Sequence, residues 1–484
     1  MNKKLIIHLL GAILLIEALA MAPSAAISLI YGDGDWPALL IPMGILVLLG
    51  APPWLMVKPG SDVNLRAREG FVTVALAWIL LSLFGALPFV FSGVLPSYVD
   101  AIFEAVSGFT TTGATVITDL DGLPRGIMFW RSFTHWIGGM GVLVLTLALL
   151  PKMTGRTSHL MRAESAGPSF SKILPKLGDS AKILYLIYGV LTVLEWVLLM
   201  MPGGMNAYDA AIHAMGTAGT GGFSNYGLSV GAFNSAAVDI IITVFMLLFS
   251  TNFALYFRLL IGDWKSVWKS EELRWFLGIY LVSTLFISGM ISPEYGGFFH
   301  ALRYGSFQVA SIMSTSGYAT ANFDLWPQAV RMLLVMLMFV GACAGSTAGG
   351  LKVVRIALLC KMGRREIRRT FQPRKVQVIR FEGKGVEESM LSQITAYVSM
   401  LMLMTLACAF LISLENTFDF TTNLTAAITA IFNVGPGLGA VGPMGNFAGY
   451  TPFSKYVLSF IMLCGRLELF PILALFHPAV WQRG

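Results

Sequence analysis

The sequence predicts an all-α integral membrane protein, in which an N-terminal two-helix hairpin precedes four membrane–pore loop–membrane repeats around one pore. Only 12% of its 484 residues are charged and 56% are hydrophobic, whereas a soluble domain usually has about 25% charged residues. The mean hydropathy is +0.73. Four short stretches rich in threonine, serine and glycine also recur between apolar segments. We therefore expect about ten spanning helices and four re-entrant half-helices.

The four recurring stretches are divergent copies of one unit. They occupy residues 109–115, 217–223, 314–320 and 432–439. Their anchor glycines are Gly113, Gly222, Gly317 and Gly435, at intervals of 109, 95 and 118 residues. Each copy contains the same parts in the same order: a long apolar segment, a short amphipathic segment, the turn and a second apolar segment. This irregular period predicts four repeats of one structural unit.

Two apolar segments precede the repeats and form the predicted hairpin, residues 1–69. Residues 1–22 resemble a secretory signal, and Ala20-Met21-Ala22 resembles a cleavage site, but the apolar run continues past Pro23 to Ile30. The apolar run is too long for a signal peptide, so it predicts an uncleaved spanning helix. Residues 37–57 predict a second span, and the basic residues that follow predict a cytoplasmic loop.

Each repeat contains a first span, a half-helix and a returning span. Repeat one, residues 70–160, has these at 71–93, 96–108 and 125–150; repeat two, residues 161–274, has them at 183–201, 207–217 and 233–260. Repeat three, residues 275–385, has them at 275–291, 298–313 and 326–360; repeat four, residues 386–484, has them at 390–414, 420–432 and 453–476. The half-helices are too short to cross a bilayer and are therefore predicted to be re-entrant.

Basic residues are distributed unevenly about these segments. The chain has 33 Lys and Arg against 26 Asp and Glu, and 25 of the 33 fall in stretches that this topology places in the cytoplasm. This positive-inside pattern predicts a multi-pass inner-membrane protein with both termini in the cytoplasm. Residues 361–384 carry nine of the basic residues. They predict a solvated loop that touches anionic lipid or docks a partner.

The chemistry of the recurring stretches favours an alkali cation. Non-helical backbone at membrane depth is tolerated only inside protein or around a water-filled cavity. Carbonyl oxygens from four such segments could surround a desolvated cation, aided by glycine flexibility, by threonine and serine hydroxyls and by the negative ends of the half-helices. The turns carry no carboxylate ring and no histidine or cysteine cluster, as divalent or transition metals would need.

The predicted ion-binding residues lie around the four anchor glycines. They are Thr110, Thr111, Thr112, Gly113, Thr220, Gly221, Gly222, Thr315, Ser316, Gly317, Asn433, Val434 and Gly435. A single such turn is more often a helix break or a packing site, and the prediction depends on all four occurring in matching positions. His213 and Glu104 on the half-helices favour packing or hydrogen bonding. Cys343, Cys360, Cys408 and Cys464 lack metal-type spacing and are expected to be free thiols.

Two further features predict a gate. A glycine-rich break interrupts the returning segment of repeat three, although small residues also serve helix packing. Arg466 lies inside the last apolar segment, where a charge is a functional candidate unless it pairs with Glu468 or a neighbouring carboxylate. The candidate gating residues are Gly345, Ser346, Thr347, Ala348, Gly349, Gly350, Lys352 and Arg466.

At these residues the whole chain resembles the TrkH/TrkG branch of the Trk/Ktr/HKT superfamily of potassium transporters. The hairpin, the four loops, the break at 345–350 and the Gly-Arg-Leu-Glu sequence at 465–468 carry the resemblance. It implies four units around a single pore, a homodimer, and a cytoplasmic TrkA-type partner with nucleotide-binding RCK domains. It also implies a filter glycine in each loop, a gating loop at the break and a pore-facing Arg466. The filter glycine could be Gly221 or Gly222 in loop two, and Gly435 or Gly437 in loop four.

The expected function is potassium uptake across the bacterial inner membrane by channel-like permeation. K⁺ would be the transported ion, without a bound organic cofactor, and membrane lipid rather than nucleic acid would surround the chain. The alternative is a Na⁺- or H⁺-coupled K⁺ symporter, since broken helices also build carrier sites. The sequence does not suggest an enzyme, because it shows no nucleophile–base pair, metal motif or phosphate loop.

Overall fold

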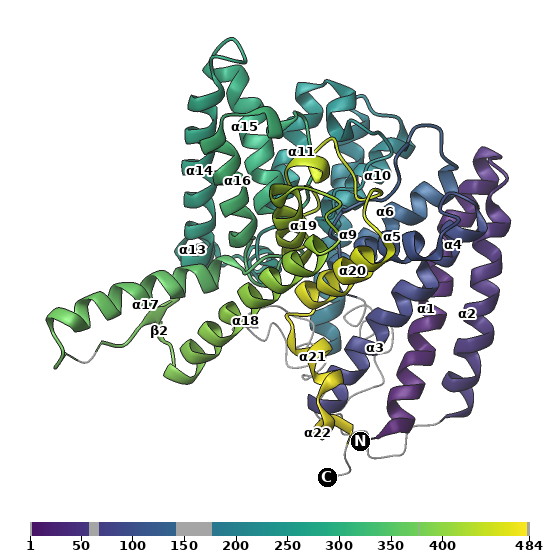
Figure 1. Ribbon diagram of the computed structural model, residues 1–484, viewed down its shortest axis with the longest axis horizontal. Coiled ribbons are helices and arrows are strands. Elements are labelled where there is room, and N and C mark those ends of the chain that lie inside the picture. The colour runs from purple at the N-terminus through teal and green to yellow at the C-terminus, as the bar shows by residue number, and fades with distance from the viewer. Residues whose placement is uncertain (1, 58–66, 142–176, 376, 482–484) are drawn as a thin grey trace.

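The computed structural model describes residues 2–57, 67–141, 177–375 and 377–481, and these residues are mainly helical (Figure 1). Length and apolarity identify six candidate membrane spans in the described segments, and one sharply bent helix pair would be a seventh. The predicted membrane fold class is therefore confirmed. The total of about ten spans stays a prediction.

The N-terminal hairpin forms as predicted. It consists of α1 (Lys3–Tyr31) and α2 (Trp36–Met56), which lie side by side at one edge of the molecule (Figure 1). Gly11 and Gly50 let the two backbones meet, because a Cβ on either glycine would lie 2.8 Å from the carbonyl oxygen of the other. Residues 58–66, where the cytoplasmic loop is expected, lie outside the described residues.

Repeat one has a re-entrant half-helix between its other helices. Its elements are α3 (Ala67–Gly85), α4 (Leu87–Phe91), the half-helix α5 (Tyr98–Phe109) and α6 (Arg125–Gly139). The second half of the predicted returning span, residues 142–150, and the basic stretch up to residue 176 lie outside the described residues.

Repeat two departs from the prediction in its returning segment. Its elements are α9 (Leu177–Met200), the half-helix α10 (Ala207–Gly219), the 3-10 turn η1 (Ser229–Phe233), α11 (Ala236–Phe249), α12 (Phe253–Leu260) and α13 (Trp264–Lys269). The single predicted span over 233–260 is wrong, since α11 and α12 meet at 91°. The Asn252 side chain caps α12 by accepting from the Ala254 N–H, while the freed Ser250 carbonyl accepts from Cys343 N–H.

Repeat three contains the predicted break and a longer helix after it. Its elements are α14 (Glu271–Ile291), the half-helix α15 (Phe298–Met313), η2 (Phe323–Leu325), α16 (Gln328–Val340) and α17 (Val353–Phe371). The prediction of a loop over 361–384 is wrong for its first half, which α17 occupies. The remainder contains the antiparallel pair β1 (Arg380–Phe381) and β2 (Lys384–Gly385).

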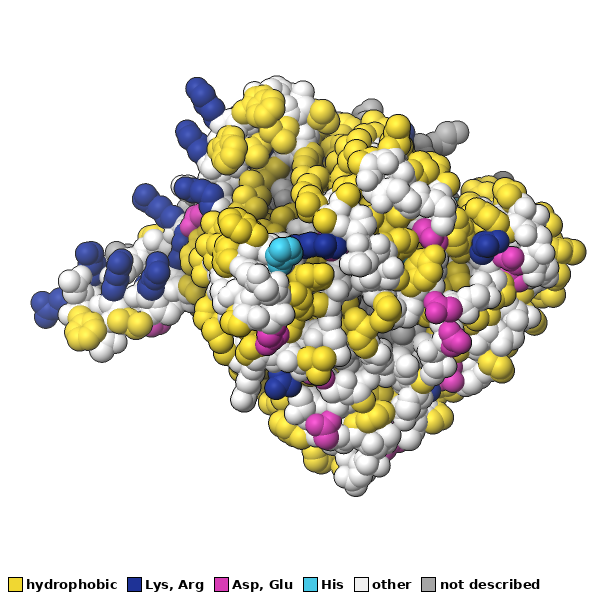
Figure 2. Space-filling view, turned by 90° about the horizontal axis from the view of Figure 1, so that it is seen from above, with side chains coloured by type: hydrophobic (Ala, Val, Ile, Leu, Met, Phe, Trp, Pro, Cys, Tyr) yellow, Lys and Arg dark blue, Asp and Glu magenta, His cyan; other side chains and the backbone are white. Residues whose placement is uncertain are grey.

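The second half of α17 belongs to an arm that projects from the body (Figure 1). Met362 in this half of α17 packs against the cluster that contains Ile379 and Leu391 of α18 (Glu388–Ser413), and Lys361 Nζ donates to the Arg380 carbonyl at 2.6 Å. These contacts with later parts of the chain stabilise the segment as a helix. Lys and Arg side chains follow the arm on the face shown in Figure 2. Its exposed basic residues are Arg364, Arg368, Arg369, Arg374, Lys375, Arg380 and Lys384.

Repeat four also ends in a broken helix. After α18 it contains the half-helix α19 (Phe420–Phe432), η3 (Gly439–Val441), α20 (Pro452–Arg466), α21 (Phe470–Phe476) and α22 (Pro478–Trp481). The continuous span expected over 453–476 is wrong. Glu468 and Leu469 have φ of 54° and 65°, left-handed values that stop an α-helix. Arg466 consequently lies at a helix end rather than in mid-span.

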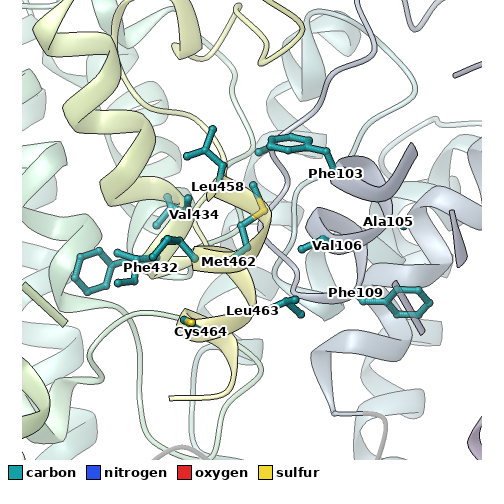
Figure 3. Close-up of a cluster of buried hydrophobic side chains, with 14 of the residues drawn as sticks. Phe103, Ala105, Val106, Phe109, Phe432, Val434, Leu458, Met462, Leu463 and Cys464 are labelled. Atoms are coloured by element: carbon teal, nitrogen blue, oxygen red, sulfur yellow. The ribbon is translucent and has the colours of Figure 1, made fainter. Parts of the chain in front are cut away.

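The hydrophobic core joins the first and last repeats. Figure 3 shows Phe103, Val106 and Phe109 of α5, Phe432 and Val434 at the end of α19, and Leu458, Met462 and Leu463 of α20. All of these side chains are buried. The core therefore brings the ends of two half-helices, far apart in sequence, to the centre of the molecule.

The hairpin contact gives a stability prediction. Gly11→Leu should destabilise the protein by about 1–3 kcal/mol, because the added side chain overpacks a backbone–backbone contact. Gly44→Leu is the matched control, since Gly44 lies on the same hairpin with open space around its Cα. Thermal midpoints of the purified variants in one detergent measure the difference. Equal midpoints for the two variants would contradict the close-packing argument.

Candidate functional site

The four recurring loops share one backbone conformation. The residue two positions before each anchor glycine is left-handed: Thr111, Thr220, Thr315 and Asn433 have φ of 55°, 54°, 57° and 54°. The anchors Gly113, Gly222, Gly317 and Gly435 have φ of 79°, 75°, 73° and 103°. Gly221 and Gly437 are not left-handed. The backbone therefore makes Gly222 and Gly435 the structural equivalents of Gly113 and Gly317.

Each loop also ends its half-helix with the same hydrogen bond. The residue before the anchor glycine donates its N–H to the carbonyl oxygen five residues earlier. The pairs are Thr112 to Ser107 at 2.9 Å, Gly221 to Gly216 at 2.9 Å, Ser316 to Ser311 at 2.9 Å and Val434 to Thr429 at 3.0 Å. Such left-handed caps satisfy the last turn of a helix while redirecting the chain.

The anchor glycines bring the loops together in a ring. A Cβ on any of them would lie less than 3.0 Å from a carbonyl oxygen of the next loop, closer than real Cβ atoms come. In each contact the anchor glycine faces the carbonyl oxygen of a residue in the next loop. The pairs of anchor and carbonyl are Gly113 and Gly221, Gly222 and Ser316, Gly317 and Val434, and Gly435 and Thr112. The ring thus closes in chain order, and glycine is the residue that fits at each contact.

The hydroxyl and amide side chains of the loops serve mainly as braces. Thr110 Oγ1 donates to the Val106 carbonyl at 2.7 Å and lies 2.8 Å from Thr112 Oγ1. Thr220 Oγ1 donates to the Gly219 carbonyl at 2.6 Å. Asn433 Nδ2 donates to Thr112 Oγ1 at 2.9 Å, which ties loop four to loop one.

A cavity of about 160 Å³ opens at the ring. All four anchor glycines line it, together with Arg131, Phe223 and residues that follow the glycines in loops one, two and four. The half-helices point their C-terminal ends toward the same ring, and these ends carry partial negative charge. The arrangement can therefore stabilise a cation by backbone oxygens and helix dipoles.

The glycine-rich break between α16 and α17 lies against the ends of the loops. Gly349 N–H donates to Thr315 Oγ1 at 2.8 Å, and Gly350 N–H donates to the Phe432 carbonyl at 3.0 Å. Thr347 Oγ1 donates to the Phe249 carbonyl at 3.2 Å. The break thus touches loop three and the half-helix of repeat four, as well as the end of α11.

Arg466 holds the break to repeat one. Its guanidinium donates from Nη1 to the Thr347 carbonyl at 2.8 Å and from Nη2 to the Gly139 carbonyl at 2.8 Å. Glu468 instead pairs with Arg355, at 2.7 Å. Lys352 is buried, and its Nζ donates to the Ala348 carbonyl within the break. The sequence-predicted gating residues are therefore assembled around one point below the ring.

One buried ion pair went unrecognised in the sequence. Arg131 Nε lies 2.6 Å from Glu104 Oε1, and the two side chains are 1% and 0% exposed. The sequence predicts packing or hydrogen bonding for Glu104, and the hydrogen bonds are present, but its pairing with Arg131 was not predicted. Two opposite charges in otherwise apolar membrane segments were the signal that could have identified the pair. His213 is a hydrogen-bonding residue as predicted, with Nδ1 at the Asp209 carbonyl and Nε2 at Ser224 Oγ.

The part of the chain that the structure describes contains no group of three or more His, Cys, Asp and Glu side chains that could hold a metal ion. Within the same residues the four cysteines are free thiols. Among the described residues no Asp or Glu lines the cavity at the ring, so the oxygens that a cation would meet there are neutral.

Comparison with known proteins agrees with this architecture. The TrkH family model, described as a cation transport protein, matches residues 38–289 and 299–483. The Trk system potassium uptake protein TrkH of Halomonas elongata is 37% identical, and that of Escherichia coli strain K12 is 36% identical, each over 100% of both chains. The crystal structure of the potassium transporter TrkH from Vibrio parahaemolyticus matches with a TM-score of 0.90 and 34% identity, also over 100% of both chains. The chain therefore belongs to the TrkH family of cation transport proteins.

Proposed function

We propose that this chain is the pore-forming subunit of a bacterial inner-membrane potassium uptake system, with K⁺ passing in a channel-like manner through the ring of four loops. The observation that carries the proposal is the closed order of glycine–carbonyl contacts from loop one to loop four. Full-length relatives named as potassium uptake proteins support K⁺ as the ion.

The proposed filter consists of backbone rather than charged side chains. The carbonyls of Thr112, Gly221, Ser316 and Val434 lie beside the neighbouring anchor glycines. Backbone carbonyls can replace the hydration shell of K⁺, and neutral oxygens bind it weakly enough to let it leave. The proposed ion-binding set also includes the four left-handed residues that direct the backbone of each loop toward the ring. They are Thr111, Thr220, Thr315 and Asn433.

The proposed gate is the break, residues 345–350 with Lys352, held closed by Arg466. The break is hydrogen-bonded to elements of several repeats. Its displacement therefore requires these hydrogen bonds to break and new ones to replace them. A cytoplasmic nucleotide-binding partner of the TrkA type could dock on the basic arm and favour the displaced position, provided that it binds the two states with different affinity. A homodimer would present two such arms to the partner.

The filter prediction concerns glycine at the ring. In liposomes the wild-type protein should pass K⁺ and Rb⁺ in preference to Na⁺, and Gly113→Ser or Gly317→Ser should reduce this preference. The added Cβ displaces a neighbouring carbonyl, and displaced carbonyls no longer match the dehydrated ion. Isotope flux and single-channel currents measure the permeability ratio.

Gly122→Ser is the matched control for the filter variants. Gly122 has φ of 80° but open space around it, so serine there incurs only the ~1–2 kcal/mol cost of a left-handed residue. Unchanged permeability ratios in both filter variants would refute the carbonyl ring. K⁺ flux that requires a Na⁺ or proton gradient would support the symporter instead.

A second prediction concerns the positive charge below the ring. Arg466→Ala should raise K⁺ flux severalfold, because it removes an electrostatic barrier and a tether of the break. Arg466→Lys should keep the flux low because it retains the charge. Flux measurements on monodisperse protein test both variants. If Arg466→Ala is unstable and its flux per folded molecule is unaltered, Arg466 is structural.

A third prediction concerns the length of the break. Deleting Ser346, Thr347 and Ala348 should allow K⁺ flux without partner or nucleotide, because the shortened segment no longer reaches the loops. Replacing the same three residues with glycine preserves the length and serves as the control. A folded deletion variant that remains as silent as the intact protein would place the gate elsewhere.

A further inference from the structure

The Glu104–Arg131 ion pair lies behind the ring and holds backbone from two loops. Thr115 Oγ1 donates to Glu104 Oε1 at 2.9 Å, and Val116 N–H donates to Glu104 Oε2 at 2.9 Å. Arg131 Nη1 donates to the Ser224 carbonyl at 2.9 Å. Glu104 therefore fixes the segment after Gly113 of loop one, while Arg131 reaches the corresponding segment of loop two.

The other repeats lack a charged equivalent of Glu104. Nine positions before the anchor glycine, repeats one to four carry Glu104, His213, Gln308 and Ala426. His213 reaches Ser224 Oγ at 3.0 Å, in the same manner as Glu104 reaches its own loop. Gln308 is buried, and both of its amide atoms lack a hydrogen-bond partner among the described residues. The strongest brace is therefore confined to one side of the ring.

Arg131 also contributes to the entrance of the proposed pathway. It lines the cavity that the four anchor glycines share, and its guanidinium carbon lies 3.5 Å from the centroid of the Phe223 ring. An unneutralised positive charge at this position would repel an approaching cation. Glu104 supplies the compensating charge at hydrogen-bond distance, and it forms part of the same half-helix that ends at loop one.

We propose that Glu104 and Arg131 are a positioning pair, which fixes loop one against loop two and keeps the cation entrance electrically neutral. The pair would act on selectivity through the loop backbone, without touching the ion. This inference rests on the proposed function of the ring and adds a determinant of its selectivity.

The test compares Glu104→Gln with Asp239→Asn in liposomes. Asp239 is buried and forms an ion pair with Arg303 at 2.6 Å, between α11 and α15, so it controls for loss of an ion pair elsewhere. Glu104→Gln should raise the Na⁺/K⁺ permeability ratio between about twofold and thirtyfold, the range for residues that act on a site through a contact network. It should also lower K⁺ flux, because Arg131 loses its counter-charge. Asp239→Asn should leave the permeability ratio at the wild-type value.

The double variant Glu104→Gln/Arg131→Met separates charge from position. It should recover K⁺ flux, since the positive charge is gone, while the raised permeability ratio persists because the tether between the loops is absent. A merely structural pair would not produce this split. Wild-type permeability ratios in both the single and the double variant would overturn the proposal.

Thr115→Val decides the question if Glu104→Gln does not fold. This change removes one donor to Glu104 but preserves both charges, and a smaller rise in the Na⁺/K⁺ permeability ratio is expected. A wild-type ratio for Thr115→Val would then overturn the proposal. Gly113→Ser is the reference for the ring itself. If it changes the ratio and Glu104→Gln does not, only the positioning pair fails; if the wild-type protein does not distinguish K⁺ from Na⁺, the proposed function fails.

Discussion

The need to satisfy backbone polar groups inside a membrane governs this structure. Loops at membrane depth cannot rely on water, so their N–H and carbonyl groups need partners within the protein. Each half-helix meets this need with its own left-handed cap, as in the 3.0 Å bond from Val434 N–H to the Thr429 carbonyl. The capped loops then meet at glycine–carbonyl contacts too close for any Cβ. Because each loop limits the position of the next, the four loops form one mechanical unit.

The same constraint explains why the broken helices converge below the loops. A helix break frees polar groups, and here the freed groups of different breaks bond to one another. Cys343 N–H donates to the Ser250 carbonyl, and Phe253 N–H donates to the Gly345 carbonyl at 3.0 Å. From the end of α20, Arg466 Nη1 donates to the Thr347 carbonyl. The break in repeat three is therefore an integral part of the hydrogen bonding below the ring, and a displacement of the break would alter the surroundings of the loops.

The sequence predicted correctly those helices whose ends are set by neighbouring residues in the chain. The half-helices over 298–313 and 420–432 begin and end at the predicted residues, because apolar periodicity and a following glycine turn define them. The bend between α11 and α12 was missed because it depends on a distant partner of Ser250. The helical arm after residue 360 was missed because its stabilising contacts come from later in the chain: Met362 packs against the cluster that contains Ile379 and Leu391, and Arg365 pairs with Glu388. The Glu104–Arg131 pair likewise depends on how α5 and α6 pack, which spacing along the chain does not reveal.

Divergence among the four loops is itself a consequence of a backbone-built site. The four residues that precede the anchor glycines have unrelated side chains, yet each presents its carbonyl to the anchor glycine of the preceding loop in the ring. They are Thr112, Gly221, Ser316 and Val434. The ring therefore requires glycine at the anchor position and a left-handed backbone two residues earlier. The side chain of the residue between these two positions can vary. Side chains are then free to take different bracing roles in each repeat. Where the last repeat meets the first, the Asn433 amide bonds to both Thr112 Oγ1 and the Met462 carbonyl. Asn433 thereby links loop four to loop one. This contact closes the ring, although the four repeats follow one another along the chain and differ in sequence.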